Sequence, residues 1–243
     1  MSTRGNMTRF DLQSNLTSPQ SEFSLQAQGK NFPTASLGSG EAELLQTQMN
    51  DILQAVPSSI VTDFLMKRQD VIASAAAFSK QVFDEKLFGG LNAGDNEIGF
   101  DILRPGHIRA DPASGAAEND WYFDPAGTGW VDWIGDGSTN NYTGNEDQVT
   151  VVLGFIDQDV STEASGLNVE EFGRNVDMLP KDLNDMRLRD NDTELQLEPL
   201  PSMILQENDD VHMRLRYDRN VESQPRLLGF TFGLGTFLDT EDY

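Results

Sequence analysis

The sequence VTVVLGFI at residues 149–156 decides the fold. Its almost unbroken apolar character predicts a strand that is buried on both faces. A second run, VHMRLRY at residues 211–217, alternates between apolar and polar side chains. A period of two predicts a strand that turns one face to a core and the other to solvent. These two strands together predict a layered β structure with an apolar interior.

Shorter runs on both sides of these strands extend the same pattern. Apolar and polar residues alternate at residues 98–102 and 193–197, and the apolar run LLGFTF occupies residues 227–232. Segments rich in Gly, Pro, Asn and Asp separate the runs and predict turns. Short strands between turns favour a mainly β fold, an antiparallel β-sandwich or jelly roll, over residues 91–243. One short helix is predicted at residues 169–175.

Residues 40–90 have a helical pattern instead. Apolar residues of the first half fall on one helical stripe, and Pro57 breaks the pattern before a second helix. Gly89 and Gly90 are a helix stop. Two interpretations stay open: the helices pack on their own domain, or they form a subunit contact or stalk. In the second interpretation the contact residues are Leu45, Met49, Ile52, Phe64, Val71, Phe78 and Val82.

Residues 1–39 form a third region, rich in Ser, Thr, Gln and Asn and without a sustained period. This composition predicts an extended N-terminal arm or a disordered segment. Two roles are open for it. It is either a free tail, or an arm that becomes ordered against neighbouring subunits with Phe10, Phe23 and Phe32 as its anchors.

The chain is strongly acidic, with 17 Lys and Arg against 40 Asp and Glu and a net charge of -23. Such a surface excludes nucleic acid as a general partner, because phosphate binding needs clustered cations. Self-repulsion destabilises an acidic protein in dilute salt, but in molar salt the Debye length falls to about 3 Å and screens it. We therefore favour a protein of an extreme halophile or of its virus. The alternative is an ordinary acidic or calcium-loaded protein.

We expect neither cysteine-based sites nor a membrane or secretory segment. The chain has no cysteine, which excludes disulfides, thiolate metal sites and a cysteine nucleophile. No apolar run approaches the roughly 18–20 residues of a membrane span. The first residues lack the apolar region of a secretory signal, so we expect neither a span nor a cleaved leader.

Motifs of catalytic chemistry are missing from the sequence. It contains no phosphate-binding glycine loop, zinc-binding HExxH or nucleophile elbow, and its only histidines are His107 and His212. We expect no enzymatic activity and no required cofactor. Trp121, Trp130 and Trp133 lie near acidic residues and are candidates for a glycan-binding platform. The alternative, which we favour, is an aromatic core at one end of the sandwich.

One loop has the spacing of a calcium site. Asp136, Ser138, Asn140 and Asp147 occupy positions 1, 3, 5 and 12 of an EF-hand-like loop. Asn141 stands at position 6 in place of Gly, and position 12 is Asp in place of Glu. These residues are therefore a candidate site for Ca²⁺ or another structural cation, and the alternative is a solvated loop. A protein of this charge also implies high K⁺ or Na⁺ around it.

The arginines of the β region gather at one place. Arg214, Arg216 and Arg219 form its only concentrated cation group. A cationic strand face on a polyanionic chain is either paired within the chain or placed against another acidic surface. Intramolecular pairing and an intersubunit contact are both open.

Three runs, ILRPGHIR at residues 102–109, GWVDWIG at 129–135 and RLLGFTFG at 226–233, resemble virion structural proteins of haloarchaeal viruses. The resemblance covers roughly residues 95–240 and carries over no catalytic residue. It implies a jelly-roll protein that serves as coat, capsid decoration, turret or spike.

The same resemblance implies partners and a location. The chain would be a trimeric or pentameric homo-oligomer, located in the virion after assembly in the host cytoplasm. Its partners would be copies of itself, other capsid proteins and a host surface glycan. The rival function is a carbohydrate-binding or host-attachment β module, with a glycoside hydrolase as a further alternative.

Overall fold

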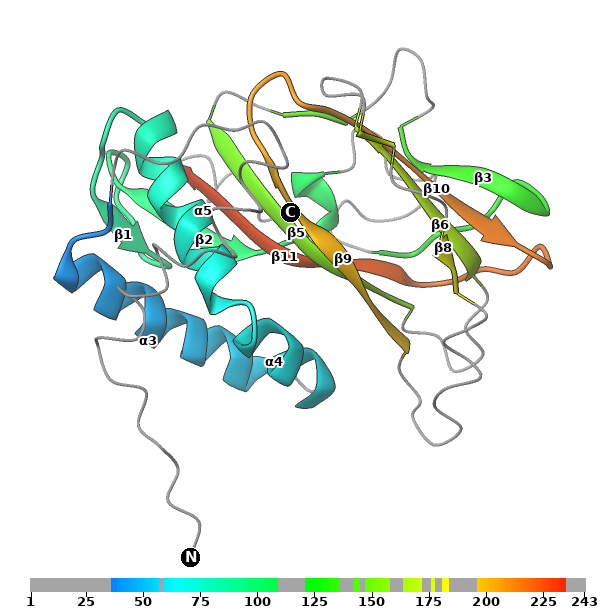
Figure 1. Cartoon of the computed structure of the whole chain (residues 1–243), viewed down its shortest axis with the longest axis horizontal. Helices are drawn as coiled ribbons and strands as arrows, with labels where there is room; N and C mark the ends of the chain where they lie inside the picture. The colour runs from blue at the N-terminus through cyan, green and yellow to red at the C-terminus, as the bar shows by residue number, and fades with distance from the viewer. Residues whose placement is uncertain are drawn as a thin grey trace, which may run out of the picture. The chain divides into compact units, whose positions relative to one another are not determined.

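The computed structural model describes residues 36–56, 59–108, 121–135, 142–144, 147–157, 164–171, 176–177, 181–183 and 196–234 (Figure 1). The chain divides into two compact units. The first unit comprises Met1–Asp101 and Phe232–Leu238, and the second comprises Ile102–Thr231 and Asp239–Tyr243. The division after Asp101 places the first two strands with the helices, whereas the sequence analysis placed the boundary at residue 91. The predicted arm with Phe10, Phe23 and Phe32 lies outside the described residues.

The described part of the first unit contains three helices, where the sequence predicted two over residues 40–90. They are α3 (Ser39–Ala55), α4 (Ser59–Met66) and α5 (Gln69–Val82). The additional break falls at Lys67 and Arg68, where the Arg68 guanidinium carbon lies 3.9 Å from the centre of the Phe64 ring. The Arg68 N–H donates to the Leu65 carbonyl at 3.0 Å, and this turn ends α4 before α5 begins.

The helices pack on their own unit. Leu45, Met49, Phe64, Val71 and Phe78 are all buried within the single chain. They are therefore unavailable as subunit contacts, and that interpretation of these five residues was wrong. A heptad-like stripe arises from core packing as readily as from a partner helix, because both bury one helix face. Ile52 and Val82 are half-buried.

Two short strands complete the first unit. β1 (Phe88–Gly90) pairs in parallel with β2 (Ile98–Ile102). Ring centroids of Phe88 and Phe100 lie 5.6 Å apart, and those of Phe100 and Phe232 lie 5.8 Å apart. Phe232 lies near the end of β11 (Pro225–Leu234), which passes from the second unit into the first. These three aromatic side chains form part of the first unit's core.

The described strands form two sheets. β11, β5 and β9 are neighbours in a five-stranded sheet of order β1-β2-β11-β5-β9, and the second sheet has the order β3-β10-β6-β7, with β4 and β8 paired to β10 and β6. The strands not yet placed are β3 (Gly129–Ile134), β4 (Tyr142–Thr143), β5 (Gln148–Asp157), β6 (Ala164–Glu171), β7 (Val176–Asp177), β8 (Lys181–Asp182), β9 (Gln196–Leu205) and β10 (Asp210–Tyr217).

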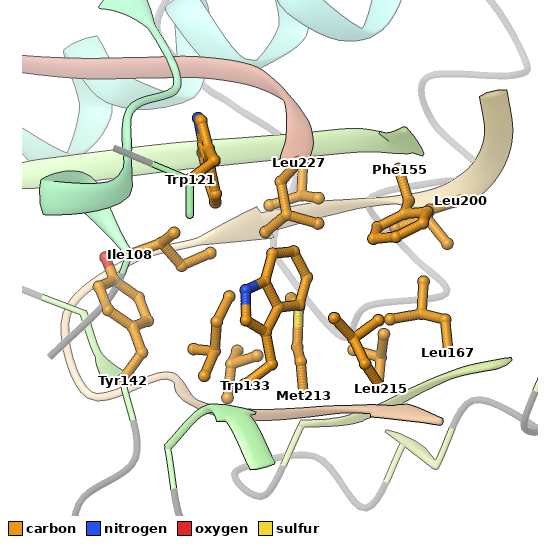
Figure 2. Close-up of a cluster of buried hydrophobic side chains, with 14 of the residues drawn as sticks. Ile108, Trp121, Trp133, Tyr142, Phe155, Leu167, Leu200, Met213, Leu215 and Leu227 are labelled. Atoms are coloured by element: carbon orange, nitrogen blue, oxygen red, sulfur yellow. The ribbon is translucent and has the colours of Figure 1, made fainter. Parts of the chain in front are cut away.

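An apolar core lies between these sheets. Figure 2 shows Trp133, Met213 and Leu215 of one sheet pointing toward Phe155 and Leu227 of the other. The Trp133 ring meets the Phe155 ring edge-on, with their centroids 5.8 Å apart. The predicted antiparallel β-sandwich is thereby confirmed. The helix predicted at residues 169–175 was wrong, because strand β6 extends to Glu171 and pairs with β10 along its length.

A bulge in β3 adds a second core side chain. Met213 pairs with Ile134 and Arg214 pairs with Asp132, so Trp133 is the extra residue between them. A bulge places two residues of one strand opposite one residue of its partner. Both Trp133 and Ile134 are consequently buried, although they are adjacent in sequence.

Candidate interaction surface

The solvent-facing side of the β3-β10-β6 sheet carries the polar groups that the sequence analysis singled out. We call this side the outer face. Alternation places Met213 and Leu215 in the core, so the residues between them on β10 point outward. Cross-strand pairing then sets their neighbours on both flanks. From one end to the other, the outer face carries His212, Glu170, Asp132, Arg214, Asn168, Arg216 and Trp130.

The first end of the outer face is a closed polar network. His212 Nε2 lies 2.8 Å from Asp132 Oδ1, and His212 Nδ1 lies 3.3 Å from Glu170 Oε2. The His212 side chain is only 5% exposed. Each ring nitrogen thus lies within hydrogen-bond distance of one carboxylate oxygen. The sequence placed His212 on a strand, and the structure gives it two acidic partners.

Glu170 connects this histidine to Arg214. Its Oε1 accepts hydrogen bonds from Arg214 Nη2 at 2.5 Å and from Asn168 Nδ2 at 2.9 Å. Burial raises the pKa of Glu170, but the hydrogen bond from His212 and the charge of Arg214 outweigh it and hold that pKa below its ordinary value. Arg214 is therefore paired within the chain. Of the two alternatives that the sequence left open, intramolecular pairing or an intersubunit contact, the first holds for this residue.

The other end of the outer face is open. Arg216 pairs across the strands with Trp130 on one side and Gly166 on the other. Its side chain is 52% exposed, and its Nε is 3.9 Å from Asp218 Oδ1. Trp130 is 41% exposed. Arg219 and Val221 follow β10 and are also exposed. We call Trp130, Arg216, Arg219 and Val221 the open end.

The three tryptophans do not form one platform. Trp121 and Trp133 are buried, with ring centroids 6.0 Å apart, inside the sandwich core (Figure 2). The three-residue glycan platform was therefore wrong, because packing between the sheets takes two of its members out of contact with solvent. Trp130 alone remains on the surface.

The predicted cation site lies mostly outside the described residues. Asp136, Ser138 and Asn140 are among the residues that the structure does not describe, and Asp147 is an exposed residue in the turn before β5. Within the described part of the chain, no group of three His, Cys, Asp or Glu side chains is arranged to hold a metal ion. The calcium site stays a prediction.

The other histidine has a structural role. His107 is buried at the end of the short 3-10 helix Pro105–His107. Its Nδ1 accepts a hydrogen bond from the Arg104 backbone N–H at 3.2 Å, and its carbonyl oxygen accepts one from Gln148 Nε2 at 2.6 Å. His107 therefore joins this turn to the start of β5 in the second unit.

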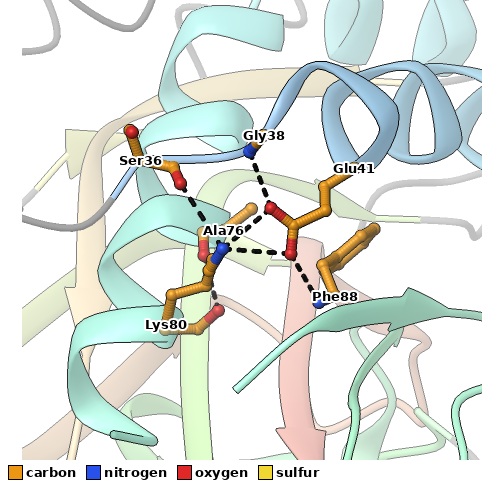
Figure 3. A network of polar contacts seen from close by, with 7 residues as sticks. Ser36, Gly38, Glu41, Ala76, Lys80 and Phe88 are labelled. Atoms are coloured by element: carbon orange, nitrogen blue, oxygen red, sulfur yellow. Dashed lines mark hydrogen bonds and ion pairs between the residues drawn. The ribbon is translucent and has the colours of Figure 1, made fainter. Parts of the chain in front are cut away.

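A second polar network, in the first unit, was not anticipated from the sequence. Figure 3 shows the Glu41 carboxylate between Lys80 of α5 and the start of β1. It accepts hydrogen bonds from Lys80 Nζ at 2.7 Å, Phe88 N at 2.9 Å and Gly38 N at 2.6 Å. Burial raises the pKa of Glu41, but the Lys80 contact and the two backbone hydrogen bonds together hold it below its ordinary value.

None of the helices in the described part of the chain combines the length and the apolar character that crossing a lipid bilayer requires.

Comparisons with known proteins leave the family open. No family model matches the chain, and no curated protein matches it. Among solved structures, chains of the infectious bursal disease virus Gt and Gx strains share 11% and 8% identity with it, both at a TM-score of 0.24. The alignments cover 55% and 58% of this chain, but only 31% and 33% of those chains.

Latent PorU from Porphyromonas gingivalis aligns at 11% identity and a TM-score of 0.23, over 56% of this chain and 12% of that chain. The chain thus spans a third or less of the structures it matches. All three TM-scores are too low to assign a common fold.

Proposed function

We propose that this chain is a non-enzymatic virion structural protein. In this proposal it assembles with copies of itself, as a trimer or pentamer, in or on the icosahedral capsid of a halophilic virus. Coat, decoration, turret and spike are all compatible with it. The observation that carries the proposal is the open end: an exposed tryptophan beside an exposed arginine, on a chain with a net charge of -23.

The chemistry of the open end is that of a protein contact. Trp and Arg are enriched among the residues that carry most of the binding energy at interfaces. The exposed arginines Arg216 and Arg219 can also pair with carboxylates of a partner, and complementarity of charge steers association and suppresses wrong partners. The acidic surface present at the highest local concentration during assembly is that of another copy of this chain.

An oligomer measurement tests this function. The wild-type protein in molar KCl should sediment as a homo-oligomer, and the Trp130→Ala, Arg216→Glu double variant should sediment as a monomer. Lys67→Glu is the matched control, because it makes the same charge change at an exposed residue of the first unit. A wild-type protein that stays monomeric at every concentration would exclude self-assembly.

A folding titration tests the halophilic origin separately. If the acidic surface is an adaptation to high salt, the melting temperature should rise steeply with KCl up to molar concentrations, because screening removes self-repulsion. NaCl should act similarly. An acidic protein of a dilute-salt habitat should instead be fully stable without added salt.

Trp130 also supports a second candidate function, a host-attachment module that binds a glycan. An exposed aromatic ring on a sheet can stack on a sugar face, and Trp130 is the described tryptophan available for this. Glycan-array binding that is lost in Trp130→Ala but retained in Arg216→Glu would favour attachment. Loss of oligomerisation in both variants would favour assembly.

A further inference from the structure

Strand β1 lies at the edge of the described five-stranded sheet. It comes first in the strand order and pairs in parallel with β2. The Leu87 carbonyl, just before β1, accepts a hydrogen bond from the Ile98 N–H at 2.8 Å and so faces β2. Successive residues of a strand direct their backbone groups to opposite edges. The Phe88 N–H therefore points away from β2, where an added strand would bond it.

Helix α3 covers this edge with two side chains. The Phe88 N–H donates to Glu41 Oε1 at 2.9 Å, and the Leu91 N–H donates to Gln48 Oε1 at 3.0 Å. Glu41 and Gln48 are about two helical turns apart, so both lie on one face of α3. These side chains thus occupy two backbone donors that an added strand would need.

A glycine allows both donors to face the helix. In a regular strand the N–H groups of Phe88 and Leu91 would point to opposite edges. Gly90 has a φ of 76°, and the register of β1 against β2 shifts between Phe88 and Gly90. This irregularity turns the Leu91 N–H toward Gln48. A Cβ at Gly90 would collide with the Gln48 side chain, so the glycine also makes room for the contact.

Glu41 is the ionisable part of this contact (Figure 3). Its Oε2 accepts hydrogen bonds from Gly38 N at 2.6 Å and Lys80 Nζ at 2.7 Å, and Lys80 Nζ also donates to the Ser36 carbonyl at 3.4 Å. In the described part of the chain, Lys80 of α5 is the charged group that faces Glu41. β1 and the start of α3 contribute uncharged N–H groups. One carboxylate therefore joins α3, α5 and the edge of β1.

Protonation of Glu41 weakens all of these contacts together. A neutral carboxyl group no longer attracts Lys80 as an ion, and one of its oxygens carries a hydrogen. Burial raises the pKa of Glu41, but the Lys80 contact and the backbone hydrogen bonds outweigh it and lower the pKa from 4.5. The contribution of Glu41 to stability is thus present at neutral pH and lost as the pH falls through the folded pKa. Gln48 does not titrate.

We propose that α3 is an acid-releasable cover on the edge of β1, with Glu41 as the contact that opens and Gln48 as the contact that holds. On protonation of Glu41, the start of α3 separates from β1, and the Phe88 N–H becomes accessible while the rest of the sheet stays paired. Local opening of this kind makes available a backbone donor that strands bind. The device lies within one chain and does not rest on the proposed self-assembly.

Hydrogen exchange, read amide by amide by NMR on the full chain, tests the cover. Glu41→Gln is neutral at every pH. At pH 7 the Gly38 and Phe88 amides of this variant should exchange faster than in wild type by about tenfold or more, because each loses a hydrogen bond to a charged acceptor. The Leu91 amide should change little, since Gln48 still holds it. Asp51→Asn, at an exposed carboxylate of the same helix, is the matched control and should exchange as wild type does.

Acid should affect wild type as the substitution does at neutral pH. The Phe88 exchange rate is divided by the Leu91 rate in the same sample, which removes the intrinsic effect of pH on exchange. In wild type this ratio should rise as the pH falls below about 5, where a carboxyl group begins to titrate. In Glu41→Gln the ratio should be high already at pH 7 and independent of pH.

Three results would overturn the inference. In the first, the Phe88 amide of Glu41→Gln exchanges as slowly as in wild type. In the second, the ratio of the two rates rises in acid equally in both proteins, so that another group opens the contact. In the third, the amides of Phe88, Leu91 and β5 accelerate by the same factor, which means that the chain unfolds as a whole and α3 is not a separate cover. None of these results changes the test of self-assembly by sedimentation.

Discussion

Glu41 in the first unit and Glu170 in the second are the centres of two polar networks with opposite character. The Glu41 carboxylate is 15% exposed and its partner Lys80 is 10% exposed. Glu170 and its partner Arg214 are 24% and 35% exposed. Both carboxylates accept several hydrogen bonds, yet the first network joins α3, α5 and β1, whereas the second covers the surface of one sheet.

The two networks separate charge that this chain uses for stability from charge that it exposes at its surface. Around Glu41 the donors include two backbone N–H groups, so the network completes the hydrogen bonding of a helix start and a strand. Around Glu170 the donors are side chains, and the row continues to Arg216, which has only a 3.9 Å ion pair. The outer face is therefore tightly hydrogen-bonded at one end and exposed to solvent at the other.

Removal of Lys80 should have the largest effect on this contrast. Lys80→Met leaves the partly buried Glu41 carboxylate without its cation but with two backbone donors, a change that should cost about 1–3 kcal/mol. The midpoint of urea unfolding in molar KCl measures it. Lys67→Met, at an exposed residue of the same unit, should shift the midpoint little. Equal effects of the two substitutions would show that the buried pair is not important for stability.

Glu170→Gln should have a smaller effect. The network around Glu170 is partly exposed, so loss of its charge should cost about 1 kcal/mol. The amide keeps an acceptor oxygen but no longer neutralises Arg214. We expect unfolding to shift slightly and the oligomer to persist, because this end of the outer face is not the proposed contact.

The stability that Glu41 contributes should depend on pH. The pKa of Glu41 is lowered from 4.5, so its contribution to stability is fully present above the unfolded pKa and is lost as the pH falls through the folded pKa. The difference in stability between wild type and Glu41→Gln should be constant from neutral pH to about pH 5 and shrink below it. Urea unfolding at successive pH values measures this, and a difference that grows in acid would contradict the sign.

The dependence of stability on salt concentration should give the smallest difference between the two networks. The cost of Glu170→Gln should decrease as KCl rises, since exposed charges are screened beyond a Debye length. The cost of Lys80→Met should be almost independent of KCl, because the buried pair is shielded from ions. Thermal unfolding at several KCl concentrations gives both slopes, and parallel slopes would remove the distinction between the networks.

Much of the fold was predictable from the sequence, because strand alternation is local. The run at residues 211–217 reported both its core face and its cationic face correctly. The partners of those cations were not predictable. Glu170, Asp132 and Trp130 come to lie beside β10 only through the register of two other strands, and residue spacing does not reveal register.

The apolar stripe of the helices shows what local sequence patterns cannot distinguish. Its period correctly predicted one buried face, but the sequence did not distinguish a core of the same chain from a partner subunit. The buried pair of Glu41 and Lys80 was missed for the same reason as the surface partners, since the two residues are 39 positions apart.

The bulge at Trp133 has a consequence for mutational tolerance. In a regular strand, positions that tolerate substitution alternate with positions that do not. We expect β3 to show this alternation over Trp130, Val131 and Asp132. At Trp133 the alternation of buried and exposed positions should end, because Ile134 is buried as well. A substitution scan of β3 should therefore show two intolerant positions in succession. Deletion of one of them should remove the bulge and leave the pairing of Asp132 with Arg214 in place.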